Sequence, residues 1–241
     1  YIQNFSTLPP KVKKLAGSAL LKLDASFIDH LIGELKSLDP DSRLRAALIF
    51  ENLAVGGKAK DALLEGMKDP SKKVRAAIVK TLGVLGDKAL LSSLIEFFND
   101  PDERVRANAI EAVSGIGDDR AVKLLLPFLE DSNNRIRANA ALAVWQIGKV
   151  NIIPFLNKML SSGDALMKAS ALWVFGEMKS ELYLSMILTH VKDKAEIVRL
   201  NALKAIAKIK PDVLKPMLPN LRHDASAEVK KLVAELSFKI I

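Results

Sequence analysis

The chain has 241 residues, of which 49% are hydrophobic and only 5% aromatic, and its formal net charge is +8. The composition is rich in Ala and Leu, which favours closely packed helices over strands. The absence of cysteine excludes disulfides and thiolate metal sites. We recognise no signal peptide and no apolar run of 18 residues, so we expect a cytoplasmic protein without membrane insertion.

The N-terminal segment differs from the rest of the chain. It begins with Tyr1 rather than Met, which suggests a module of a longer protein. The Pro9-Pro10 pair blocks a helix up to that point. The stretch 11–23 (KVKKLAGSALLKL) then resembles a lone second helix. Residues 1–24 are therefore predicted to form a partial repeat that caps the array.

From residue 25 onward, one pattern recurs, clearest as NDPDERVRANAIEAVSGIG at 99–117. Each copy contains a marker, an apolar residue followed by a basic one. The basic residues are separated by 30 residues at the first interval and by 31 at every later one: Arg45, Arg75, Arg106, Arg137, Lys168, Arg199 and Lys230. A fixed period of this length is typical of a solenoid. We expect two helices in each unit and one domain of seven repeats, at approximately 25–57, 58–88, 89–119, 120–150, 151–180, 181–210 and 211–241.

Turn residues mark the ends of the expected second helices. Each of three Asp-Pro pairs supplies a capping carboxylate and a proline suited to a first helical turn: Asp39-Pro40, Asp69-Pro70 and Asp100-Pro101. Four glycines are predicted to close second helices in the left-handed conformation: Gly56, Gly86, Gly117 and Gly148.

This arrangement of residues resembles the HEAT repeat, specifically the short HEAT-like repeats of phycobilisome lyases. The matching pattern is D-P-x-x-x-V-R-A-x-A followed by an aliphatic residue and Gly, best at 69–86 and 100–117. The resemblance covers about 25–241. It implies an all-α fold, a right-handed α-solenoid of about seven two-helix repeats. It implies little about function, because the family includes scaffolds, lyase subunits and glycosylases.

An Asp six residues before the basic marker recurs along the array, and Ser162 replaces it once. We call these acids and the arginines the ladder: Asp39, Arg45, Asp69, Arg75, Asp100, Arg106, Asp131, Arg137, Asp193 and Arg199. Such pairs could bind an anion, but a site rarely repeats six times. We interpret the ladder as structural, with each Arg reaching the capping Asp of its own or a neighbouring repeat.

Counted from the basic marker, apolar residues at −1, +3, +4, +7 and +10 form one helical stripe, and +5 points away from it. In a HEAT-like solenoid that direction is the concave face. There +5 places Phe50, Lys80, Glu111, Leu142, Trp173, Lys204 and Glu235, and +2 adds Asn108, Asn139 and Asn201. These amides could grip an extended peptide, as in armadillo proteins, or bond to neighbouring loops. Trp145, at +8, could join Leu142 and Trp173 in an anchor patch or fill space between repeats.

No catalytic, metal or cofactor site is predicted, since no recognisable catalytic motif occurs and the three histidines lie in different repeats. Our leading hypothesis is a non-catalytic scaffold that binds a protein or peptide segment on the concave face. Nucleic-acid binding of the HEAT-like glycosylase type is the alternative, favoured by the positive charge but opposed by its scattered distribution. A chromophore-lyase subunit rests on resemblance alone.

The last predicted helix ends in Leu236, Phe238, Ile240 and Ile241, which is unusually apolar for a terminal repeat that faces water. We therefore expect a partner, a second copy or further chain to contact this end.

Overall fold

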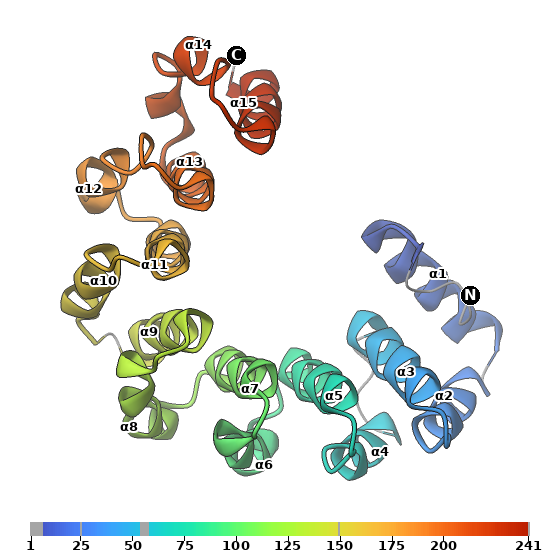
Figure 1. Ribbon diagram of the computed structural model, residues 1–241. Coiled ribbons are helices and arrows are strands. Elements are labelled where there is room, and N and C mark those ends of the chain that lie inside the picture. Colours follow the sequence, from blue (N-terminus) through green and yellow to red (C-terminus); the bar gives the residue numbers. More distant parts are fainter. Residues whose placement is uncertain (1–6, 25, 54–57, 149, 241) are drawn as a thin grey trace. The chain divides into compact units, whose positions relative to one another are not determined.

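The computed structural model describes residues 7–24, 26–53, 58–148 and 150–240, and every regular element in them is a helix. Contacts divide the chain into two compact units, 1–121 and 122–241. Unit 1 comprises α1 (Pro10–Leu23), α2 (Phe27–Leu35), α3 (Pro40–Leu53), α4 (Lys58–Gly66), α5 (Lys72–Leu85), the 3₁₀ helix η2 (Lys88–Leu90), α6 (Leu91–Ile95), η3 (Glu96–Asn99), α7 (Glu103–Ile116) and η4 (Asp119–Ala121) (Figure 1).

Unit 2 continues the same alternation of a short first helix and a longer second helix. Its elements are α8 (Val122–Leu125), η5 (Leu126–Glu130), α9 (Asn134–Gly148), α10 (Ile153–Leu160), α11 (Ala165–Met178), η6 (Glu181–Tyr183), α12 (Leu184–Leu188), α13 (Glu196–Ile209), η7 (Pro211–Leu214), α14 (Leu218–Leu221) and α15 (Ala227–Ile240). The predicted all-α solenoid of two-helix repeats is confirmed. The inclusion of both units in one domain stays a prediction.

Each unit has two layers of helices. In unit 1 the second helices α3, α5 and α7 lie side by side, and α2, α4 and α6 cover one face of that row (Figure 1). In unit 2 α9, α11, α13 and α15 form the corresponding row, covered by the shorter helices. The core lies between the layers, as α7 illustrates: Val105, Ala109, Ile110, Val113 and Ile116 are all buried. The predicted apolar stripe therefore faces the first helices.

Each described second helix from α3 onward follows a turn of one kind. A side-chain oxygen accepts a hydrogen bond from the backbone N–H two residues later, which positions the helix start. The acceptors are Ser37, Asp69, Asp100, Asp131, Ser162, Asp193 and Asp224, at 2.7 to 3.2 Å. In α5 and α7 the prolines precede the helix, because Ser71 and Asp102 are the N-caps. The prediction that Asp69-Pro70 and Asp100-Pro101 cap these helices directly is therefore wrong.

The predicted glycine ends are confirmed at two positions. Gly86 and Gly117 follow α5 and α7 with φ of 64° and 69°, the left-handed conformation that glycine adopts without a Cβ clash. Gly148 instead is the last residue of α9 and lacks a positive φ. A Cβ there would lie 2.9 Å from Val122 Cγ2, so close packing explains that glycine. Gly56 lies outside the described residues. No helix in the described ranges is long and apolar enough to cross a membrane.

Candidate protein-binding surface

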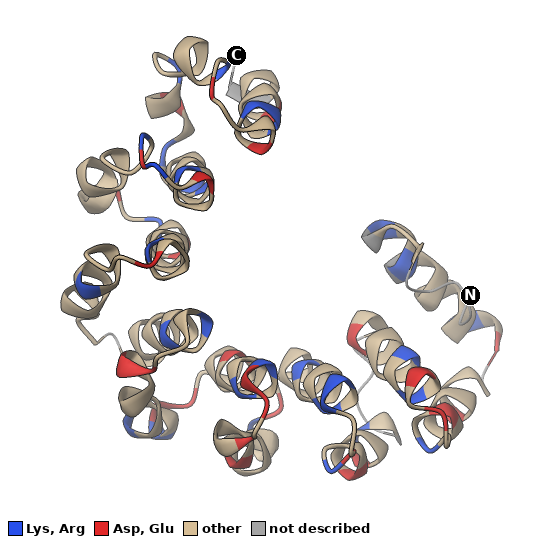
Figure 2. Ribbon diagram, in the orientation of Figure 1, with Lys and Arg blue, Asp and Glu red and all other residues tan. Residues whose placement is uncertain are grey.

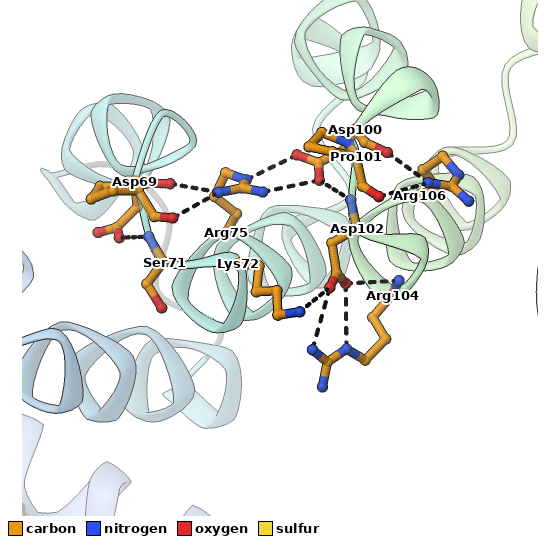
Figure 3. A network of polar contacts seen from close by, with 10 residues as sticks. Asp69, Ser71, Lys72, Arg75, Asp100, Pro101, Asp102, Arg104 and Arg106 are labelled. Atoms are coloured by element: carbon orange, nitrogen blue, oxygen red, sulfur yellow. Dashed lines mark hydrogen bonds and ion pairs between the residues drawn. The ribbon is translucent and has the colours of Figure 1, made fainter.

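The ladder joins consecutive repeats through buried charge pairs. The Arg75 guanidinium donates to both carboxylate oxygens of Asp100 in the next repeat, at 2.9 and 3.1 Å, and its third nitrogen donates to the carbonyls of Asp69 and Pro70 (Figure 3). Arg199 repeats this arrangement with Asp224. These bidentate bonds raise the pKa of both arginines. The geometry supports the structural interpretation of the ladder.

In the first repeat the ladder members differ from those predicted. Arg43, rather than Arg45, donates to both oxygens of Asp69, at 2.6 and 3.0 Å. The preceding turn is formed by Ser37, and Asp39 is released to accept hydrogen bonds from the N–H groups of Asp41 and Ser42. Arg45 forms a looser ion pair, at 3.8 Å, with Asp39 of its own repeat, so this pair does not join consecutive repeats. Helix α3 begins at Pro40 directly after Asp39, so the predicted capping by Asp39-Pro40 is confirmed, whereas α5 and α7 begin two residues after their Asp-Pro pairs.

Elsewhere the ladder is partly replaced by backbone contacts. Arg137 donates to the carbonyls of Asp131 and Glu130, because the following repeat has Ser162 in place of the acid. Arg106 donates to the carbonyls of Asp100 and Pro101. Lys168 reaches Asp193 at 3.3 Å with a single bond. The ladder arginines that bond to carbonyls therefore also, or instead, anchor a turn: Arg75, Arg106, Arg137 and Arg199.

Beside the ladder, Asp102 is the N-cap of α7 and receives hydrogen bonds from Arg104 and an ion pair from Lys72 (Figure 3). Burial raises the pKa of this carboxyl, but the bonds from Arg104 and Lys72 outweigh burial and lower it to about 2.

Because the folded pKa of Asp102 is depressed, its contribution to stability is complete above the unfolded pKa near 3.8 and is lost as the pH falls toward 2. The wild type should lose unfolding free energy as the pH falls from 4 to 2. In Asp102→Asn we expect this loss to be smaller by about 1 to 2 kcal/mol. Chemical denaturation at several pH values measures this. Asp61→Asn, which changes an exposed carboxylate on α4, should leave the pH dependence nearly unchanged. If Asp102→Asn lost as much unfolding free energy in acid as the wild type, the lowered pKa of Asp102 would be contradicted.

In each unit, the residues five positions after the basic residue of each repeat form a ridge on the second helices. In the register that the structure establishes they are Leu48, Lys80, Glu111, Leu142, Trp173, Lys204 and Glu235. The four charged residues are exposed and the three apolar ones are half-buried. Phe50 is fully buried, so its predicted exposure is wrong. Leu48 takes its place because the ladder cation is Arg43.

The predicted row of asparagines forms bonds within the protein. Asn108 is buried, and its amide donates to the Ala76 carbonyl of the neighbouring second helix at 2.9 Å. Asn139 is also buried. Asn201 is half-buried and donates to the Ile197 carbonyl one turn earlier at 2.8 Å. Ser170 accepts from the Asn134 amide at 2.6 Å. These bonds favour the structural interpretation of the row.

Helix α11 is apolar around its whole circumference, although one side of its row lacks a covering helix layer. Its sequence ALMKASALWVFGEM contains only two charged residues, and both are paired, Lys168 with Asp193 and Glu177 with Lys208. In Figure 2 this helix is accordingly mostly tan. A helix that is apolar on all sides normally has neighbours on all sides. Its outward face is therefore a candidate contact surface.

A second row of positions, two residues before each ladder cation, changes character at the same place. It carries charge on α3, α5, α7, α9 and α15, whereas on α11 and α13 it holds Leu166 and Ile197, which are 55% and 38% exposed. The full row is Asp41, Lys73, Arg104, Arg135, Leu166, Ile197 and Glu228. Sequence reasoning missed these residues, although the shortage of charge in α11 was a visible signal.

A groove of roughly 230 Å³ lies on this part of the row, in unit 2. Three adjacent second helices build it: Trp173 and Gly176 from α11; Asn201, Lys204, Ala205, Ala207 and Lys208 from α13; Leu232 and Leu236 from α15. Its surface is predominantly apolar. Of the predicted anchor residues, Trp173 lines the groove, while Leu142 and Trp145 are half-buried on the neighbouring helix α9. We call the residues that line the groove, together with Leu142, Leu166 and Ile197, the apolar face of unit 2.

The sequence and structure define an all-α helical repeat protein. The family model of HEAT repeats matches residues 28–114, 60–146, 91–165 and 153–237. The chain therefore belongs to the HEAT repeat family.

Solved structures agree on this fold. The CpcE–CpcF complex of phycocyanin lyase from Nostoc sp. PCC7120 contains a chain similar to this one, with 22% identity and a TM-score of 0.59 over 100% of this chain and 93% of that chain. The Escherichia coli protein YibA is similar as well, with 18% identity and a TM-score of 0.54 over 99% of this chain and 94% of that chain. At these identities the likeness shows the fold alone. Comparison with curated protein sequences finds no significant match.

Proposed function

We propose that this HEAT repeat chain is a scaffold that binds a protein segment on the apolar face of unit 2. The observation that carries the proposal is helix α11, which places Leu166 and Trp173 on the side of the row that the first helices leave open. Exposed apolar residues that gather in one place on a folded protein are typical of a contact surface. Tryptophan in particular is enriched among the residues that dominate binding energy.

The same face of unit 1 has a different character. Lys80 on its ridge pairs with Glu51 at 2.9 Å, and Lys72 pairs with Asp102. Lysines neutralised in this way contribute less to binding phosphates than free ones do. No observation on these residues favours nucleic acid over protein, and none favours a lyase activity.

To test the proposal, the immobilised chain and a Leu142→Ala/Trp173→Ala variant are compared for the proteins they retain from a cell lysate at moderate salt. We expect the variant to lose the specific partner at least tenfold, because truncation of a central aromatic anchor costs about 2 kcal/mol or more. Both residues are half-buried, so the fold should persist, which circular dichroism checks.

The matched control is Lys80→Ala/Glu111→Ala, which changes the same ridge positions in unit 1 and should retain the partner. Equal retention by the wild type and the Leu142→Ala/Trp173→Ala variant would contradict the proposal. If both proteins retained nucleic acid and released it as the salt concentration rose, we would instead assign the interaction to the lysines.

A further inference from the structure

The groove in unit 2 offers little for the backbone of an extended peptide. An amide that holds a strand needs both its donor and its acceptor. Asn201 is the groove's amide, and one of its two side-chain N–H donors is already bonded to the Ile197 carbonyl. Ser170, the equivalent residue on α11, already accepts from Asn134. A strand laid here would leave most of its N–H and C=O groups against apolar side chains, which costs free energy.

A helix avoids this cost because its backbone groups bond within the helix itself. The groove spans three neighbouring second helices, and packed helices lie about 8 to 10 Å apart. Its length is therefore roughly 20 Å, which a helix of about four turns covers at 1.5 Å per residue. Side chains spaced three and four residues apart on such a helix could contact Trp173 at one end and Leu232 at the other.

The charge of the groove indicates what accompanies the apolar side chains. Its lining contains two lysines and no acidic residue. Lys208 is paired with Glu177. Lys204 is exposed and takes part in no ion pair within the described residues. An unpaired lysine beside an apolar floor favours a carboxylate at the edge of the occupant.

We propose that the groove of α11, α13 and α15 binds an amphipathic α-helix that carries Asp or Glu beside its apolar stripe. This inference rests on the proposed function and specifies its partner. Trp173 and Leu232 contact the apolar stripe, and Lys204 pairs with a carboxylate that borders it.

The test uses two displayed peptide libraries selected against the whole chain. One library presents 18-residue helices with a randomised face, and the other presents 12-residue segments with a central proline that prevents a helix. We expect enrichment from the helical library, with apolar residues at i, i+3 or i+4 and i+7 and with flanking Asp or Glu. Trp173→Ala should weaken the enriched peptides at least tenfold, and Lys204→Glu about threefold or more, an effect that diminishes with salt. Lys80→Glu, at the same ridge position in unit 1, is the matched control and should leave affinity unchanged.

The outcomes separate the two proposals. Enrichment of proline-containing segments that depend on Trp173 would overturn the helical partner and leave the proposed function standing. Helical peptides that depend on Trp173 but are rich in Lys and Arg would overturn the acidic component. If neither library yields a peptide whose affinity depends on Trp173, both the partner and the proposed function fail.

Discussion

Asp100→Ala should lower the free energy of unfolding by about 3 kcal/mol, because it breaks a buried ion pair and leaves the Arg75 guanidinium without its carboxylate. The Asp100 side chain is 6% exposed and that of Arg75 is 14% exposed, so water replaces little of the lost interaction. The change also removes the hydrogen bond from the Asp102 N–H that positions the start of α7. One carboxylate therefore joins two repeats and orders a turn.

The measurement is urea denaturation followed by circular dichroism, together with hydrogen exchange at the amides of α5 and α7. Exchange is informative because repeats couple chiefly to their neighbours, so the loss should be concentrated in unit 1. Glu181→Ala is the control, since it breaks the 2.7 Å pair with Lys210, whose partners are about half exposed. That variant should lose less than about 1 kcal/mol. If Asp100→Ala lowered the free energy of unfolding as little as Glu181→Ala does, the structural interpretation of the ladder would be refuted.

Gly83→Ala should destabilise the protein by about 1 to 3 kcal/mol, the opposite of what helix propensity predicts. Replacement of Gly by Ala inside a helix usually stabilises it by about 1 kcal/mol. At Gly83, in α5, a Cβ would lie 2.5 Å from Cβ and 2.7 Å from Cα of Ala112 in α7. Because one of these atoms belongs to the backbone, the two helices must move apart.

Gly115→Ala provides the matched control in the neighbouring helix α7. Its Cβ would have the Gly83 carbonyl oxygen as nearest neighbour, at 3.9 Å, so the gain in propensity should prevail. Thermal denaturation of the two variants should therefore move the midpoint in opposite directions. Ala112→Gly should partly rescue Gly83→Ala by restoring space. A Gly83→Ala protein as stable as the wild type would show that the helices separate without cost.

The same small-residue contact recurs in unit 2. A Cβ on Gly176 in α11 would lie 3.0 Å from Cα of Ala205 in α13. Gly83 and Gly176 occupy the same position relative to their ladder cations, eight residues after Arg75 and Lys168. Trp145 stands at this position in α9, facing solvent in part. The close approach of second helices is therefore a property of particular pairs rather than of every repeat.

Local pattern was sufficient to predict the architecture. The 31-residue period, the apolar stripe and the glycines after α5 and α7 depend on neighbours in the chain, so the sequence alone indicated helices, repeats and a structural ladder. It also placed Trp173, Lys204, Lys80 and Glu111 correctly on the ridge, because helical periodicity determines direction once the register is known.

Register itself was decided by tertiary structure. Two basic residues compete in the first repeat, and contact with Asp69 selects Arg43 over Arg45, which moves Phe50 into the core and Leu48 to the ridge. Likewise, only the neighbouring helix reveals that the Asn108 amide is occupied by the Ala76 carbonyl. A sequence specifies which side chains a helix carries on each face, whereas their partners come from residues about 30 positions away. Those distant contacts determine which surface remains open to bind.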